Sequence, residues 1–258
     1  MTDLAKKRIG IIGLGTIGSH IARAASEQGF ATVDFVMTRT AASDNYHLVE
    51  AERLGSVDEL SGRAVDLVVE AANASFVKEN ALSILNYSDL LVFSLTSLAD
   101  DDFRAKVRAK CAAAKRKVYI PHAAILGLDG IYDGRAVIED VSVTTIKHPR
   151  NLGLKTEEAG TLFDGSTRDA CSQFPRNVNV HAAVALAGIG FDHTRSKVIA
   201  DPSSKTMRHE IRVKGTGLTW SIVVQSEAVG LVTGSYTPES GAMTVRRVLA
   251  GDYDITLA

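Results

Sequence analysis

One histidine within a run of alternating residues has a clear capacity for acid–base chemistry. In "KTMRHEIRVKG", residues 205–215, an extended chain places successive side chains on opposite faces. His209 then shares an apolar face with Met207, Ile211 and Val213. An imidazole titrates near neutral pH and can serve as a general acid or base. A hydrogen-bonded core histidine without a catalytic role is the alternative, and periodicity alone favours it.

A glycine pattern near the start of the chain indicates phosphate binding. In "GLGTIG", Gly13, Gly15 and Gly18 have the GxGxxG spacing, after an apolar β-branched run and before a helical pattern. Thr16 and Ile17 begin that helix, whose free N–H groups and positive dipole end suit a pyrophosphate. A glycine-rich turn without a ligand is the alternative. We expect this turn to bind a nicotinamide dinucleotide.

The end of the second predicted strand distinguishes NAD from NADP. An acidic residue about 20 positions beyond the motif normally binds the adenosine ribose. Thr38 and Arg39 stand there instead, and Asp34 lies too early, within the strand. Arg39 can hold a 2′-phosphate, or it is a solvated loop charge. We expect NADP to be accepted and preferred over NAD, and Ala72, beyond a later strand, to contact the cofactor.

Two patterns of elements must position these residues. Up to about residue 120, short apolar strands alternate with helical segments, which indicates parallel βαβ units. Beyond that point, half-exposed alternating strands surround a single helical stretch, "NVNVHAAVALAGIG". The predicted fold class is α/β: a Rossmann-type doubly wound parallel sheet plus a second α+β domain with a largely antiparallel sheet. The domains are 1–120, with a C-terminal helix at about 238–258 packing back on it, and 121–237.

Composition excludes several classes of protein. The chain has 258 residues, 45% of them hydrophobic, and a net charge of −1, so neither a nucleic acid nor an anionic membrane is an expected partner. We see no apolar run of about 18 residues for a membrane span and no signal peptide pattern, and therefore expect a soluble cytoplasmic protein. Cys111 and Cys171 lack metal-ligand spacing, and we expect no metal.

Several segments together resemble one family, the L-aspartate dehydrogenases. They are "GIIGLGTIG", "DLVVEAAN", "VYIPHAAILGLDGI", "TTIKHP", "FPRNVNVHAAVALAGIGFDHTRSKVIADP" and "RHEI". The resemblance implies reversible oxidative deamination of L-aspartate with NAD or NADP, and a homo-oligomer, expected here to be a dimer. It also implies that the backbone amide of Ala124 meets the nicotinamide, that Asn179 contacts the cofactor and that His209 is catalytic.

The chain departs from the family pattern at three places. The family usually has a small residue at the position of His122 and commonly an alanine at that of His181, and "TPESGAMT" lacks a lysine near the end. His122 ends a predicted parallel strand, where ligands bind in such sheets. Packing is the favoured role for His181, which heads an apolar helix.

A dicarboxylate substrate needs cationic partners. Lys147 is the leading candidate because it alternates with Val141 and Val143 on one strand face, ahead of Arg150 and Arg195. A solvated strand-end lysine is the alternative. Two other functions stay open. One is a dehydrogenase or reductase of the same fold that acts on another amino or imino acid, and the other is an inactive regulatory protein that senses NADP.

Overall fold

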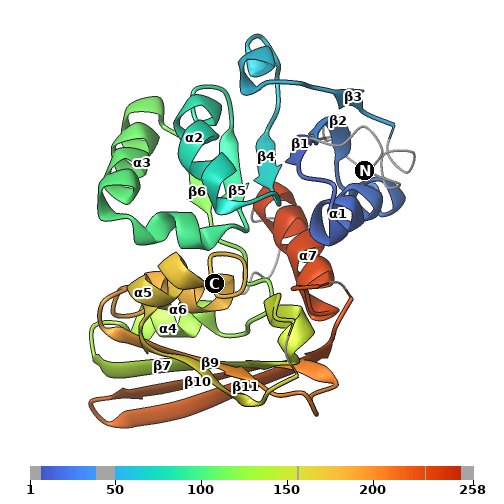
Figure 1. Cartoon of the computed structure of the whole chain (residues 1–258). Coiled ribbons are helices and arrows are strands. Elements are labelled where there is room, and N and C mark those ends of the chain that lie inside the picture. Colours follow the sequence, from blue (N-terminus) through green and yellow to red (C-terminus); the bar gives the residue numbers. More distant parts are fainter. Residues whose placement is uncertain (1–6, 39–49, 156, 230, 251–258) are drawn as a thin grey trace. The chain divides into compact units, whose positions relative to one another are not determined.

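The structure is a computed structural model that describes residues 7–38, 50–155, 157–229 and 231–250 (Figure 1). It divides into two compact units. The first contains residues 1–94, 100–121 and 238–258, and the second contains 95–99 and 122–237. The short segment Leu95–Ala99 therefore belongs to the second unit, which the expected boundaries do not anticipate. In the described residues, no helix is long and apolar enough to cross a membrane.

The first unit is built on a parallel sheet with the strand order β3-β2-β1-β4-β5-β6. Its strands are β1 (Arg8–Ile12), β2 (Thr32–Met37), β3 (Glu52–Arg53), β4 (Leu67–Glu70), β5 (Asp89–Val92) and β6 (Val118–Tyr119). The central strands are almost wholly apolar because helices cover both sheet faces. The strand order reverses between β1 and β4, and ligands bind beyond the strand ends at such a point.

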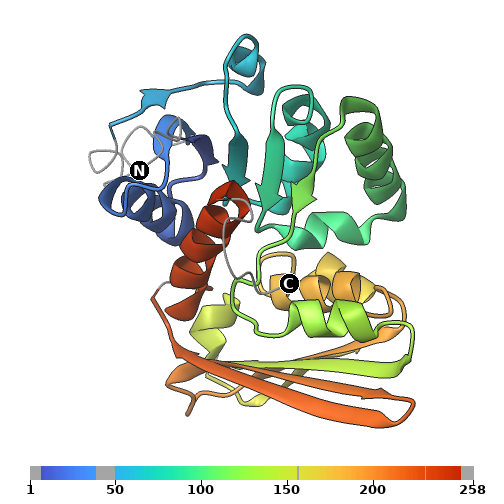
Figure 2. The ribbon, with the colours of Figure 1, turned by 180° about the vertical axis from the view of Figure 1, so that it is seen from behind.

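Among the residues that the structure describes, four α-helices belong wholly or mostly to this unit. They are α1 (Thr16–Glu27), α2 (Ala74–Ile84), α3 (Asp101–Ala114) and α7 (Tyr236–Ala250), with a 3-10 turn at Val57–Leu60. Helix α1 buries Ile21, Ala24 and Ala25 along one stripe. Helix α7 lies beside α1 in both views (Figures 1 and 2). Its Gly241 leaves room for the ring of Phe93 and a methyl group of Ile21.

The second unit contains a five-stranded sheet with the order β11-β10-β7-β9-β8. Its strands are β7 (Ile138–Lys147), β8 (Gly160–Ser166), β9 (Thr194–Ala200), β10 (Thr206–Gly215) and β11 (Leu218–Glu227). Neighbours pair antiparallel except β7 and β9, which are parallel. The largely antiparallel sheet expected from the sequence is therefore confirmed, with one parallel pair at its centre.

Helices cover one face of this sheet (Figure 2). They are α4 (Leu128–Gly134), α5 (Thr167–Gln173) and α6 (Asn179–Ala187), with 3-10 turns at Leu95–Ala99 and Pro149–Leu152. The expectation of a single helix among the strands is wrong. Helices α4 and α5 are each seven residues long, and "LDGIYDG" contains two glycines, so neither has enough turns to show an apolar period.

Candidate functional site

In the turn after β1, packing within the protein requires glycine at two positions. The third glycine has free space around its Cα. Gly13 has φ +90°, and a Cβ there would lie 2.6 Å from the carbonyl oxygen of Ala71. A Cβ on Gly18 would collide with the carbonyl oxygen of Gly13. Around Gly15, in contrast, a Cβ would meet nothing within 4 Å. The open space lies where a pyrophosphate must approach the backbone, so the residues present fit a dinucleotide.

The first turn of α1 presents amides to this space. Gly15 and Thr16 are exposed, and Ile17 is half-buried. Ser19 donates both its N–H and its hydroxyl to the carbonyl of Gly15, at 3.0 and 2.7 Å. Within the described chain no side chain caps the start of α1, so its first N–H groups are available to an anion.

Ala72 lies on the other side of the same turn and is held there by a buried carboxylate. The Cα of Ala72 would be 3.0 Å from a Cβ on Gly13. Glu70 ends β4 and accepts from the N–H of Ala72 at 2.8 Å and from the hydroxyl and N–H of Ser94 at 2.8 and 3.1 Å. Burial raises the pKa of Glu70, and these donors oppose the rise. Sequence reasoning missed Glu70, which reads there as an acid that interrupts an apolar strand.

Replacing Gly15 and Gly18 separately tests these assignments. We expect Gly15→Ala to weaken coenzyme binding by at least about 10-fold, because the methyl group occupies the space for the pyrophosphate. Its free energy of unfolding should change by less than about 1 kcal/mol, since φ −73° and ψ −165° suit alanine. Gly18→Ala should destabilise the fold by about 1–3 kcal/mol through overpacking. Coenzyme titration and urea denaturation measure both, and unchanged affinity in Gly15→Ala would contradict the assignment.

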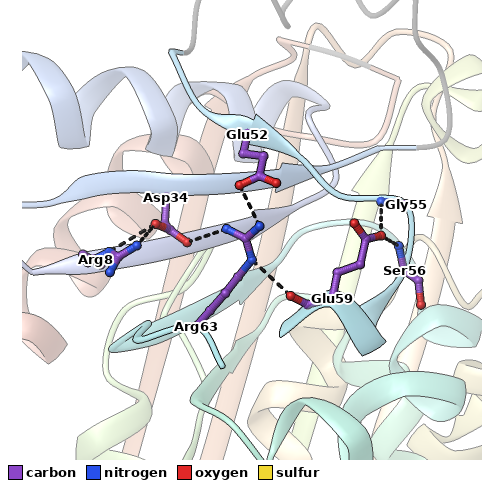
Figure 3. Close-up of polar contacts among 7 residues, drawn as sticks. All are labelled: Arg8, Asp34, Glu52, Gly55, Ser56, Glu59 and Arg63. Atoms are coloured by element: carbon purple, nitrogen blue, oxygen red, sulfur yellow. Dashed lines mark hydrogen bonds and ion pairs between the residues drawn. The ribbon is translucent and has the colours of Figure 1, made fainter. Parts of the chain in front are cut away.

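The end of β2 lacks a free acid at the expected place. Asp34, within β2, pairs with Arg8 and with Arg63, whose Nη1 lies 3.3 Å from its Oδ2 (Figure 3). Its carboxylate is therefore committed to the sheet edge rather than to a ribose. The carbonyl of Thr38 accepts from Nη2 of Arg53 at 3.1 Å. Arg39, the predicted 2′-phosphate partner, lies outside the described residues.

The same edge carries Arg53, a cation beside Thr38 that the sequence analysis does not consider. Arg63 also pairs with Glu52 at 2.6 Å, and Glu59 accepts from the N–H groups of Gly55 and Ser56 at 2.8 and 2.9 Å (Figure 3). These contacts fix the segment that follows β3. Arg53 lies in β3, next to this segment, and its side chain contacts Thr38.

In the second unit, His209 lies on the covered face of its sheet, as its alternation predicted. Strand β10 pairs with β7 so that His209 stands opposite Thr145, and its side chain is 4% exposed. Its Nδ1 is 2.8 Å from the hydroxyl oxygen of Thr145. Burial lowers the pKa of His209 well below its usual value, and electrostatic interactions with Lys147 and His181 lower it further. The imidazole is therefore neutral at physiological pH.

Lys147, the last residue of β7, lies on the same face and is 2% exposed. Its Nζ donates to the carbonyl of Val232 at 3.3 Å. Burial lowers the pKa of Lys147 to about 8. No carboxylate pairs with it among the described residues, although an ammonium has three donors. The alternative of a solvated strand-end lysine is therefore excluded. Arg195, another of the candidates, is paired with Asp164 at 2.8 Å.

The remaining predicted residues of the second unit lie at or before the starts of α4 and α6. His122 and Ala124 lie in the turn before α4, both half-buried, where Ala123 has φ +50°. Asn179 begins α6, and its Oδ1 accepts from the N–H of Thr96 at 3.3 Å. The hydroxyl of Thr96 donates to the carbonyl of Pro175 at 2.8 Å, so the segment 95–99 is tied to the start of α6.

Two family models match the chain. Residues 131–249 match the C-terminal domain of aspartate dehydrogenase, and residues 13–121 match the NAD-binding domain of homoserine dehydrogenase. The L-aspartate dehydrogenase of Nitrosopumilus maritimus is 32% identical over 238 residues, which cover 85% of this chain and 88% of that protein. That of Archaeoglobus fulgidus is 36% identical over 208 residues, covering 80% and 82%. The chain belongs to the L-aspartate dehydrogenase family.

Solved structures extend the likeness to the fold of this dehydrogenase. The crystal structure of aspartate dehydrogenase from Thermotoga maritima has a TM-score of 0.77 and 26% identity, and the match covers 98% of this chain and 99% of that one. Myo-inositol 2-dehydrogenase from Lactobacillus plantarum shares the fold alone, with a TM-score of 0.57 and 12% identity over 95% and 88% of the two chains. The predicted fold class is confirmed, and the first unit is a dinucleotide-binding domain of the dehydrogenase type.

Sequence reasoning missed the partners of the histidine in this family member. Thr145 and Ser196 are ordinary strand residues in the sequence and carry no chemical signal there. His181 is fully buried in α6, as its apolar helix predicted, but it also bonds to Thr145 and Ser196. No group of three metal-binding side chains occurs in the part of the chain that the structure describes. Both cysteines are free, and burial raises the pKa of Cys171 to about 12.

Proposed function

We propose that this protein oxidises L-aspartate with NAD(P)⁺ and water to oxaloacetate, ammonium, NAD(P)H and a proton, and catalyses the reverse reaction. The observation that carries the proposal is the covered face of the second sheet, which holds a neutral histidine and a buried ammonium that pairs with no carboxylate of the described residues. A base and a carboxylate receptor are the two groups that such a reaction needs from the protein. Membership of the family supplies the substrate.

His209 is the acid–base residue of the proposal. A bound coenzyme would supply the acceptor for the hydride that leaves the α-carbon of the substrate. The iminium carbon left behind must then gain a hydroxyl group from water. The imidazole of His209 accepts the proton that this water loses, and it returns that proton in the reverse direction. The lowered pKa of His209 keeps it in the basic form before the step.

Lys147 binds a substrate carboxylate in this proposal. A buried ammonium without an anion is costly, by several kcal/mol, and a dicarboxylate would remove that cost by pairing with it. Pairing with an anion would also raise the lowered pKa of Lys147 again. His122, in the turn before α4, is a second proposed contact for the substrate, and Ala124 and Asn179 are proposed contacts for the coenzyme.

We also propose that NADP is preferred over NAD. Asp34 is engaged by two arginines, so it is not available to bind the ribose hydroxyls or to repel a phosphate. Arg53, beside Thr38, adds a cation near the end of β2. Together with the predicted role of Arg39, this charge favours a 2′-phosphate.

Reductive amination of oxaloacetate with ammonia tests the proposal, with NADPH and NADH compared. We expect turnover with both coenzymes and a kcat/KM about 10-fold higher with NADPH, since one charged hydrogen bond is worth about 1.5–3 kcal/mol. A panel of amino acids with NADP⁺ is the companion measurement. Activity confined to a non-acidic amino acid would favour another amino or imino acid as substrate. Coenzyme binding without any turnover would favour a regulatory sensor.

A further inference from the structure

A continuous chain of buried hydrogen bonds leads away from His209 inside the second unit. It joins side chains of β10, β7, α6, β9 and α5 and ends on a backbone carbonyl of β9. The six residues are all between 0% and 4% exposed: His209, Thr145, His181, Ser196, Thr167 and Thr194. Two of these are histidines, and the reaction proposed above uses only one. The role of the other follows from the direction of each bond.

The carbonyl at the far end sets the direction of the first bonds. The hydroxyl of Thr167 lies 2.9 Å from the carbonyl oxygen of Thr194, which can only accept. A hydroxyl has one proton, so Thr167 must accept in its other bond, from the hydroxyl of Ser196 at 2.7 Å. Ser196 has then used its own proton. It must accept from Nδ1–H of His181, 2.8 Å away.

His181 passes this direction on. Burial lowers its pKa to about 3, and the charge of Lys147 contributes, so the ring carries one proton, which is on Nδ1. Its Nε2 is therefore an acceptor, and the hydroxyl of Thr145 donates to it at 2.7 Å. Thr145 must in turn accept from Nδ1–H of His209 at 2.8 Å. The remaining nitrogen of His209, Nε2, carries the lone pair.

Nε2 of His209 is also the nitrogen that remains available. The described residues place no hydrogen-bond partner on it, and it is not among their fully buried side-chain atoms that lack one. The exposed 4% of His209 thus includes the basic atom. If Thr145 could turn its hydroxyl around, it would donate to Nδ1 instead. The proton of His209 would then lie on Nε2, and that atom could not act as a base.

We propose that Thr145 and His181 are positioning residues that hold His209 as the Nδ1–H tautomer, with Nε2 as its basic atom. The role of Nε2 in water addition rests on the proposed function, whereas the tautomer does not. A purely structural network would be satisfied with either direction of the bonds. Here the carbonyl of Thr194 permits only one.

The test compares substitutions that remove the fixed direction of these hydrogen bonds with one that preserves it. Thr145→Val deletes the hydroxyl at nearly constant volume, and His181→Asn keeps an amide for Ser196 but is too short to reach Thr145. Thr145→Ser keeps the hydroxyl and is the matched control. Nitrogen NMR of ¹⁵N-histidine-labelled protein without substrate reports the tautomer, and the spectrum of a His209→Asn variant assigns the resonances.

In the wild type we expect His209 to be protonated at Nδ1 and not at Nε2. Thr145→Val and His181→Asn should populate the Nε2–H form and lower kcat by about 10- to 100-fold, less than loss of the base itself, with KM within about 3-fold. Thr145→Ser should resemble the wild type in both measurements. A wild-type His209 protonated at Nε2, or spectra unchanged in both variants, would overturn the proposal. If the tautomers are as expected but the protein does not aminate oxaloacetate, the proposal about the tautomer stands. Only the proposed function is then rejected.

Discussion

His209→Asn should lower kcat for deamination of L-aspartate by about 10²- to 10⁴-fold, the range that one general base contributes. An asparagine amide can still donate to Thr145 where Nδ1 does now, so the fold should survive. No basic nitrogen remains to accept a proton from water. We expect the affinity for NADP⁺ to stay within about 3-fold, because His209 is not among the residues assigned to coenzyme binding. Steady-state kinetics and coenzyme titration measure the two quantities.

The matched control is His193→Asn, because His193 is exposed before β9. It should keep the kcat of the wild type. The pH dependence offers a further check, since the pKa of His209 lies well below 6.5. The basic form is present above that pKa and is lost as pH falls through it, so kcat should not decrease on this account between pH 8 and 6.5. Equal rates for His209→Asn and the wild type would remove the acid–base assignment.

Lys147→Met should raise KM for oxaloacetate and lower kcat/KM by about 10²- to 10³-fold. Losing one partner of a buried charge pair costs about 2–5 kcal/mol, and methionine retains the apolar stem. In the wild type, KM for oxaloacetate should rise above pH 8, where the ammonium loses its proton. The carboxylates of oxaloacetate stay ionised over this range, so the increase reports the lysine. In Lys147→Met, KM should be high and independent of pH there.

The stability of the fold should respond in the opposite sense. Lys147 has a pKa of about 8 in the folded protein, against 10.5 without burial. Between these values the unfolded chain binds more protons, so this group adds about 3 kcal/mol to the free energy of unfolding as pH rises from 8 to 10.5. Lys147→Met should lack that increase. Lys214→Met, exposed on the other face of β10, is the control. A KM unchanged by Lys147→Met would show that this lysine does not bind the substrate.

Tertiary structure alone decided the surroundings of the histidine. Thr145, His181, Ser196 and His209 lie on four different elements. Strand pairing and the packing of α6 bring successive partners in this chain of hydrogen bonds within 2.7–2.8 Å. No local pattern carries that information, because each residue is ordinary within its own segment. The burial of Lys147 is similar, since alternation shows which face a side chain takes but not how deeply that face is covered.

The sequence by itself determined the structural features that form within one short segment. The glycine turn is readable because strand, turn and helix are consecutive, and the demand on Gly18 comes from the carbonyl of Gly13 in the same turn. The two-residue period placed His209 and Lys147 on a covered face, because a strand offers only two faces. The tautomer of His209, in contrast, depends on a carbonyl of β9 five hydrogen bonds away. Only the folded chain could connect them.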